Sequence, residues 1–268
     1  MHLKRVIAAL VLIPLFLLLV LKGSYFQYSV FVLTLAFLGL MEYFGLIDDK
    51  VDLRMKVMGI LWGVLLAGGL YAGSGQIVIA MLTFGFMAIC LLRLSKAGEL
   101  STVFQDIGYT FLGPLYVGLL LGHLMPLRAM VEGREWTLLL FFTIWMGDTA
   151  AFYTGRSIGR HKLYPEISPN KTVEGAIGGI VGSFVIVALA RTWYLNQLSL
   201  IDVTVISIGI AVMGQLGDLC ESMFKRSAGV KDSGSLIPGH GGILDRFDST
   251  LFAAPILYYY LVLIKGLD

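Results

Sequence analysis

The chain has 268 residues, of which 57% are hydrophobic and only 14% are charged, and its mean hydropathy is +0.82. Soluble domains carry about 25% charged residues, so this composition excludes an ordinary water-soluble protein, and the net charge of +2 gives no indication of nucleic-acid binding. Long apolar runs recur along the chain and do not alternate as the strands of a β-barrel would. We therefore predict an all-α, polytopic membrane protein.

Nine segments are apolar and long enough to be predicted as transmembrane helices. The first follows a basic start and precedes no small-residue cleavage site, so we interpret it as a retained span and not as a removed signal peptide. Glycine is abundant, as in AIGGIVGS at 176–183, which predicts close packing of helices. In chain order the predicted spans are 6–21, 25–47, 57–73, 76–93, 107–125, 136–155, 173–190, 201–224 and 249–264.

The Lys and Arg residues are unevenly divided between the two sides that nine spans define. Fifteen of the 20 fall on the side of the N-terminus and five on the other. Cytoplasmic loops carry the excess of positive charge, so we predict a cytoplasmic N-terminus. We divide the chain into N-terminal transmembrane helices, 1–130, and a C-terminal transmembrane catalytic region, 131–268, with cytoplasmic loops at 156–172 and 225–248.

The first polar motif is GQLGDLCESMFKR, residues 214–226, at the end of an apolar run. Asp218, Glu221 and Lys225 are spaced to lie on one helical face, with Ser222 beside them. Ionisable groups inside a span are costly and usually face a cavity, a partner or an ion. The simpler alternative is an ion pair between Glu221 and Lys225 at the membrane surface. That alternative does not account for Asp218, which has no basic residue one turn away.

The second motif is PGHGGILDRFDST, residues 238–250. Asp245 and Asp248 can face the same way as a helix begins, and two such carboxylates repel unless a cation or a base neutralises them. Mg²⁺ is commonly held by one or two carboxylates plus substrate phosphates. Stabilisation of a helix N-terminus by acids would explain one Asp, but less readily two Asp beside Arg246. The glycine-rich turn, predicted to cradle a phosphate, adds His240, Gly241 and Gly242, with positioning, hydrogen bonding or acid–base chemistry left open for the histidine.

The third motif spans residues 145–175. Asp148 lies within a predicted span, and Lys171 lies in a compact turn as a candidate for binding phosphate. Thr172 or Asn170 could cap the helix that follows.

Two further carboxylates lie in or near predicted spans, Glu42 and Asp106. Each either pairs with a basic residue or lines a cavity.

The three motifs together favour metal-assisted phosphoryl or nucleotidyl transfer at the cytoplasmic face of the membrane. No GxxxxGK[ST] phosphate-binding motif occurs in the sequence. A secondary transporter for an anionic solute would place its site near the midplane between two related halves. Here the charges lie at one face and in the C-terminal half, which disfavours a transporter. A polyprenol or dolichol kinase is the alternative among enzymes.

Residues 222–248, SMFKRSAGVKDSGSLIPGHGGILDRFD, resemble the signature of the phosphatidate cytidylyltransferases, also called CDP-diacylglycerol synthases. SPNKTVEG and GDLCES resemble further segments of that family, so the resemblance covers roughly residues 145–250 and favours this family over the kinases. It implies that CTP and phosphatidic acid form CDP-diacylglycerol and pyrophosphate, as a step of phospholipid biosynthesis. It also implies an all-helical fold in the inner (plasma) membrane, a homodimer, and a requirement for Mg²⁺, with a second cation left open.

The resemblance also implies roles for individual residues. The metal ligands would be Asp218, Asp245 and Asp248, and the catalytic groups would add Lys225, Arg226, Lys231 and His240. The residues implied to bind substrate are Asp148, Lys171, Glu221, Ser222, Gly241, Gly242 and Arg246.

Overall fold

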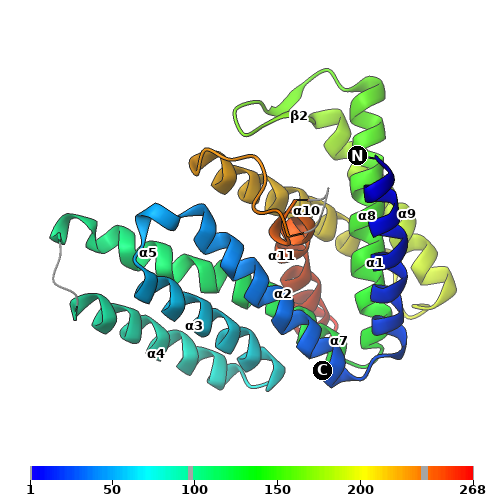
Figure 1. Ribbon diagram of the computed structural model, residues 1–268. Coiled ribbons are helices and arrows are strands. Elements are labelled where there is room, and N and C mark those ends of the chain that lie inside the picture. The colour runs from blue at the N-terminus through cyan, green and yellow to red at the C-terminus, as the bar shows by residue number, and fades with distance from the viewer. Residues whose placement is uncertain (1, 96–98, 237–240, 268) are drawn as a thin grey trace. The chain divides into compact units, whose positions relative to one another are not determined.

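The computed structural model describes residues 2–95, 99–236 and 241–267 (Figure 1). Most of them are helical, which confirms the predicted all-α class. The longer helices are α1 (His2–Lys22), α2 (Tyr25–Leu46), α3 (Leu53–Tyr71), α4 (Gly75–Leu94), α5 (Val103–Gly113), α8 (Gly133–Ile158), α9 (Val173–Trp193), α10 (Leu200–Ser227) and α11 (Leu244–Tyr259). The shorter elements are η1 (Asp48–Lys50), η2 (Leu100–Thr102), η3 (Pro114–Leu119), α6 (Leu120–Gly122), α7 (Leu124–Ala129), η4 (Tyr260–Ile264) and the strands β1 (Lys162–Tyr164) and β2 (Ser168–Thr172).

Seven helical segments of the described chain are long and apolar enough to cross a membrane. They comprise α2, α3, α4, Leu100–Ala129, α9, α10 and Leu244–Ile264. In α1 the segment Leu10–Lys22 is apolar but shorter than these seven, and α8 is less apolar because polar side chains such as Asp148 interrupt it. The chain is thus an integral membrane protein with several spans. The number of nine transmembrane helices and the location of the N-terminus on the cytoplasmic side remain predictions.

The chain folds into two compact units. The first unit comprises Met1–Pro126 and Asp232–Arg246, and the second comprises Leu127–Lys231 and Phe247–Asp268. The segment that leads into α11 therefore folds with the N-terminal helices, although it follows the long helix α10 in the sequence. The division between the units passes through the first turn of α11.

In the first unit, α3 packs against α2, α4, α5 and η3. Its Trp62 is nearly buried and donates a hydrogen bond from Nε1 to the carbonyl oxygen of Met81 at 2.9 Å. Arg93 and Asp106 form a buried ion pair, with Nε and Oδ2 separated by 2.7 Å. Of the two roles left open for Asp106, the structure shows the pairing with a basic residue.

In the second unit, α8 and α9 lie side by side, and α10 packs against α9 (Figure 1). The helices approach closely because small residues face each other: a Cβ added at Gly182 would lie 2.5 Å from the Cβ of Ala150. This contact confirms the predicted role of the glycines in helix packing.

A short antiparallel hairpin, β1 and β2, forms within the loop at 156–172, with Lys162 paired to Thr172. The hairpin ends at α9, where the side chain of Thr172 accepts a hydrogen bond from the N–H of Gly175. Of the two candidate caps, Thr172 is therefore the one that begins the helix. Glu174 secures the hairpin by accepting hydrogen bonds from the N–H groups of Arg160 and His161.

Candidate active site

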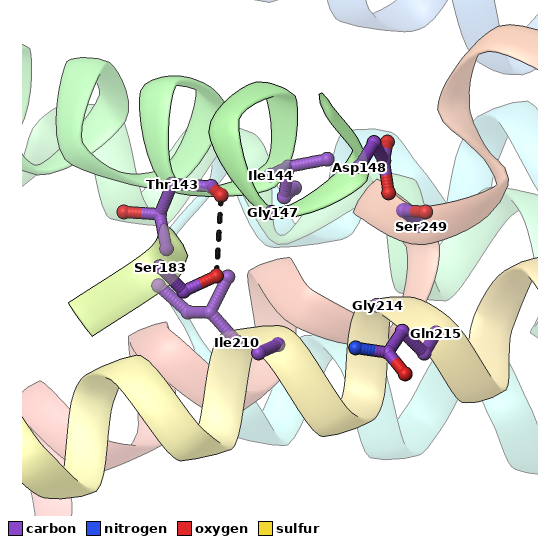
Figure 2. A pocket seen from close by; sticks show the side chains of 10 residues that line it. Thr143, Ile144, Gly147, Asp148, Ser183, Ile210, Gly214, Gln215 and Ser249 are labelled. Atoms are coloured by element: carbon purple, nitrogen blue, oxygen red, sulfur yellow. Dashed lines mark hydrogen bonds between the residues drawn. The ribbon is translucent and has the colours of Figure 1, made fainter. Parts of the chain in front are cut away.

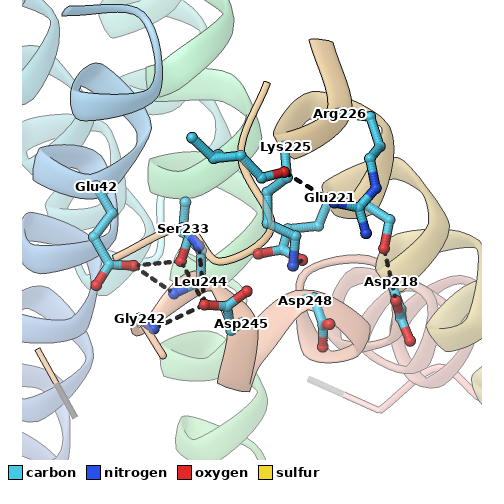
Figure 3. A network of polar contacts seen from close by, with 12 residues as sticks. Glu42, Asp218, Glu221, Lys225, Arg226, Ser233, Gly242, Leu244, Asp245 and Asp248 are labelled. Carbon is cyan, nitrogen blue, oxygen red and sulfur yellow. Dashed lines mark hydrogen bonds and ion pairs between the residues drawn. The ribbon is translucent and has the colours of Figure 1, made fainter. Parts of the chain in front are cut away.

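Polar side chains gather in two clusters, one in each unit (Figure 3). The Glu42 cluster, in the first unit, consists of Glu42, Ser233, Gly242 and Asp245. The Asp218 cluster, in the second unit, consists of Asp148, Lys171, Asp218, Glu221, Ser222, Lys225 and Asp248. Apart from Asp106, the acidic candidates from the sequence are divided between the two clusters.

Glu42 lies near the C-terminal end of α2 and is buried. Its Oε1 accepts the N–H of Ile243 at 2.8 Å. Its Oε2 accepts the N–H of Leu244 and the hydroxyl of Ser233, both at 2.9 Å (Figure 3). A carboxylate from a different helix therefore caps the N-terminus of α11, where helix dipoles favour negative charge.

Asp245 lies in the first turn of α11. Three hydrogen bonds converge on its Oδ2: from the N–H of Gly242 at 2.7 Å, the N–H of Ser233 at 3.0 Å and the hydroxyl of Ser233 at 3.1 Å. This carboxylate is thus fixed by the loop that precedes its own helix. Stabilisation of a helix N-terminus is the alternative role that the sequence leaves open for one Asp. In the structure this role fits Glu42 better than it fits Asp245.

The two glycines of this turn allow the backbone to approach the carboxylates. Gly241 adopts φ of 79°, in the left-handed region, and an added Cβ would lie 2.5 Å from Oδ2 of Asp245. A Cβ at Gly242 would lie 2.2 Å from Oγ of Ser233 and 2.3 Å from Oε2 of Glu42. No larger residue fits at Gly242 without moving these groups. The predicted contact of these glycines with a phosphate stays a prediction.

In the Asp218 cluster, Lys171 of β2 reaches α10, and its Nζ lies 2.6 Å from Oδ2 of Asp218. The hydroxyl of Ser222 lies 3.4 Å from Oδ1 of the same carboxylate. Asp218 has no basic neighbour along its own helix, and the hairpin supplies one from a distant part of the sequence. Both residues are candidates from the sequence, but no local sequence pattern connects them.

Glu221 and Lys225 form the i, i+4 ion pair that the sequence analysis named as the simpler alternative. Both side chains are nearly buried, so the pair lies within the protein rather than at an open surface. Arg226, one residue further along, donates hydrogen bonds from Nε to the carbonyl of Ile167 at 3.3 Å and from Nη1 to that of Val230 at 3.0 Å. Its guanidinium therefore ties the end of α10 to the hairpin region.

Asp248 follows Asp245 by one helical turn of α11 but belongs to the second unit. Its carboxylate is close enough to Asp218, Glu221 and Asp148 to be repelled by their charges. The Asp218 cluster therefore concentrates negative charge at the end of α10 and the start of α11, with Lys171 and Lys225 as its basic members.

A small pocket opens beside Asp148 in the second unit (Figure 2). Its volume is ≈ 10 Å³, room for about one water molecule. Thr143 lies on its wall, fully buried, and its hydroxyl has no hydrogen-bond partner among the described residues. The further polar residues that line the pocket are Asp148, Ser183, Gln215 and Ser249. This composition suits an ordered water rather than a substrate.

Among the remaining candidates, Lys231 and Arg246 lie outside the two clusters and are exposed. His240 lies outside the described residues. No ion pair or hydrogen bond of the Lys231 side chain occurs in the described part of the chain.

The carboxylates of both clusters suit a hard divalent cation, because Mg²⁺ prefers oxygen ligands. Within residues 2–95, 99–236 and 241–267, no three His, Cys, Asp or Glu side chains are arranged to surround a metal ion. In proteins Mg²⁺ is commonly held by one or two carboxylates together with substrate phosphates.

Like Ser233, Glu42 was left without a role by sequence reasoning. Its only signal in the sequence is a carboxylate inside an apolar span, which usually marks a partner or a functional site. Its hydrogen-bond partners lie 191 to 202 residues further along the chain. No spacing rule connects positions so far apart.

Comparison with known proteins matches residues 3–264 to the cytidylyltransferase family. A phosphatidate cytidylyltransferase of Staphylococcus saprophyticus is 35% identical over 258 residues, covering 96% of this chain and 98% of the relative. The phosphatidate cytidylyltransferase of Bacillus subtilis is 33% identical over 263 residues, covering 97% of each chain. That of Staphylococcus aureus strain COL is 36% identical over 265 residues, covering 96% of this chain and 98% of the relative.

Proposed function

The chain belongs to the cytidylyltransferase family and is a nucleotidyltransferase of phospholipid synthesis, and we propose that it forms CDP-diacylglycerol and pyrophosphate from CTP and phosphatidic acid. The observation that carries this proposal is the similarity to phosphatidate cytidylyltransferases over 96% or 97% of the chain. The match thus includes the N-terminal helices as well as the signature segment.

In this reaction a phosphate oxygen of phosphatidic acid attacks the α-phosphorus of CTP. The bond between the α-phosphorus and the bridging oxygen breaks, and pyrophosphate leaves with that oxygen. Attack in line with the leaving group requires both substrates to be held with their phosphates close together, so catalysis depends on positioning and on neutralising charge. The lipid reaches the site laterally from the bilayer, and CTP reaches it from the cytoplasm.

The basic residues would hold the phosphates. Lys171 and Lys225 each contact a carboxylate and lie partly or largely buried, so they present a positive charge at a fixed place. Lys231 is exposed and can reach CTP at the surface. Arg226 contributes charge at the end of α10 while it orders the nearby backbone. Ser222, Glu221, Asp148, Arg246, Gly241, Gly242 and His240 complete the proposed site.

Asp218, Asp245 and Asp248 would hold the divalent cation. A bound Mg²⁺ would offset the negative charge that accumulates on the phosphates. The hydrogen bonds to Oδ2 of Asp245 orient this carboxylate in advance. The ion pair with Lys171 likewise orients the carboxylate of Asp218. The mutual repulsion of the acidic groups supports the proposal, because a cation would relieve it.

The site would face the cytoplasm of the inner (plasma) membrane, because the many Lys and Arg residues of the loops 156–172 and 225–248 favour that side. The hairpin and the segment after α10 lie in these two loops. We also propose that the protein forms a homodimer, as its resemblance to this family implies.

The test is to incubate the purified protein in detergent with phosphatidic acid, CTP labelled in the cytosine ring and Mg²⁺. We expect a labelled lipid and an equal amount of pyrophosphate. Omission of phosphatidic acid and chelation of the cation serve as controls, and both should remove the labelled lipid. Failure to form a labelled lipid with folded protein and both substrates would contradict the proposal.

A further inference from the structure

We infer that Glu42 is a positioning residue for the proposed reaction: through Ser233 and the N-terminus of α11, it holds Asp245 in the orientation that receives a cation. This inference rests on the proposed function. Glu42 lies in α2, so the inference gives the N-terminal helices a part in the chemistry.

The contacts of Glu42 converge on a short segment of the chain. Both of its oxygens accept backbone N–H groups of successive residues, Ile243 at 2.8 Å and Leu244 at 2.9 Å. These two N–H groups lie at the start of α11, where no preceding helical turn provides a carbonyl oxygen to accept their hydrogen bonds. With Glu42 in place, the start of α11 is fixed to α2, and Asp245 is the next residue.

Ser233 connects the two carboxylates. Its hydroxyl lies 2.9 Å from Oε2 of Glu42 and 3.1 Å from Oδ2 of Asp245. A hydroxyl carries one proton, so Ser233 can donate to only one of the two carboxylates at a time. Two carboxylates that share one donor repel each other. Such an arrangement favours binding of a cation to Asp245. The hydroxyl of Ser233 then donates its hydrogen bond to Glu42.

The surroundings leave little freedom for a different arrangement. Glu42, Ser233 and Leu244 are all buried. Gly234 and Gly242 pass so close to Glu42 that an added Cβ would lie 2.7 Å and 2.3 Å from its oxygens. The backbone therefore fits closely around this carboxylate. If Gln replaced Glu42, the NH₂ group of its side chain would face at least one backbone N–H group, and two donors cannot form a hydrogen bond.

The test compares Glu42→Gln and Ser233→Ala with the wild-type protein by hydrogen–deuterium exchange and by Mg²⁺ titration of turnover. In Glu42→Gln we expect the amides of residues 242–245 to exchange about tenfold faster or more, since hydrogen bonds to a charged acceptor are lost. We expect the Mg²⁺ concentration for half-maximal turnover to rise about tenfold, with turnover at saturating Mg²⁺ changed far less.

Ser233→Ala separates the two functions of the cluster. It removes the shared hydroxyl but keeps both hydrogen bonds that the N–H groups of Ile243 and Leu244 donate to Glu42. We therefore expect these amides to exchange as in the wild type while the Mg²⁺ requirement rises. If Glu42→Gln fails to fold, Ser233→Ala carries the test.

Asp106→Asn is the matched control. Asp106 is also a buried carboxylate of the first unit, but its partners are Arg93 and Thr102. We expect this variant to leave the exchange of residues 242–245 and the Mg²⁺ requirement unchanged, even if it unfolds more easily.

Unchanged exchange in Glu42→Gln, or an unchanged Mg²⁺ requirement in both Glu42→Gln and Ser233→Ala, would overturn the inference. If the wild type forms no labelled lipid, the proposed function fails instead. The exchange measurement, which requires neither substrate nor cation, then still reports on the contacts of Glu42.

Discussion

Asp218 illustrates how a single charged residue is accommodated in an apolar helix. Its partner comes from the hairpin and not from its own helix, and the two side chains remain partly exposed, at 31% for Asp218 and 26% for Lys171. Such a pair is stabilised only modestly by its charges, because solvent screens them. A partly exposed pair can exchange partners at low cost, which suits the proposed site, where phosphates and a cation would enter.

The first prediction concerns the three aspartates. Asp→Asn at 218, 245 or 248 keeps the size of the side chain and removes its charge. We expect each variant to remain folded and to lose activity about a hundredfold or more, since loss of such a charge contact in the transition state is worth about 3 kcal/mol. The measurement is Mg²⁺-dependent CTP turnover in detergent at matched amounts of folded protein. Near-normal turnover in Asp245→Asn and Asp248→Asn would leave these residues as acids that stabilise a helix N-terminus.

The second prediction concerns Lys231, which is exposed next to the acidic segment. We expect Lys231→Ala to raise the CTP concentration for half-maximal turnover about tenfold, as expected for loss of a charged contact worth about 1.4 kcal/mol, without loss of folded protein. Lys162→Ala is the control, because Lys162 is likewise exposed and basic but lies in β1. Equal kinetics in both variants would assign Lys231 to the general positive charge of the cytoplasmic side.

Among the elements, the helices were the most predictable from the sequence. Each predicted span falls largely on helical residues of the structure, because the length of an apolar run is a local property. Contacts between distant segments were not predictable. The pair of Lys171 with Asp218 and the capping of α11 by Glu42 depend on how helices pack, which no local pattern records. The hairpin in the loop 156–172 was missed because its strands are only three and five residues long.

The third prediction concerns the contact of α8 with α9. Gly182 has no room for a side chain, since even a Cβ would lie 2.5 Å from that of Ala150. We expect Gly182→Leu to force the helices apart and to lower the yield of folded protein, because overpacking typically costs about 1–3 kcal/mol or more. Val181→Leu on the same helix is the control, since Val181 is 59% exposed and faces outward. A normal melting temperature for Gly182→Leu in detergent would show that the interface can relax.

At the scale of the whole molecule, apolar side chains cover much of the surface, as expected where helices face lipid. Trp193, at the end of α9, is 84% exposed. An aromatic residue in this position is typical of the boundary between membrane and water.

The fourth prediction concerns orientation. With Cys90 and Cys220 replaced, a single cysteine at Tyr164 or Leu236, both exposed, reports on one of the two predicted cytoplasmic loops. We expect neither to react in intact cells with a membrane-impermeant maleimide, and both to react after the membrane is opened. A cysteine at exposed Val131, on the predicted opposite side, is the control. Labelling of Tyr164→Cys or Leu236→Cys from outside would reverse the topology and the side proposed for the site.

The contacts of Glu42 also constrain the order of events during synthesis of the chain. Glu42 enters the membrane with the second helix, but its acceptor oxygens meet their donors only when residues 233–244 have been made. At about 5–20 residues per second, that interval lasts roughly 10–40 s. During this time a carboxylate in an apolar span must stay near the headgroups or beside water, because an unpaired charge in lipid is costly. The first unit, although it begins at the N-terminus, is therefore among the last parts of the protein to be completed.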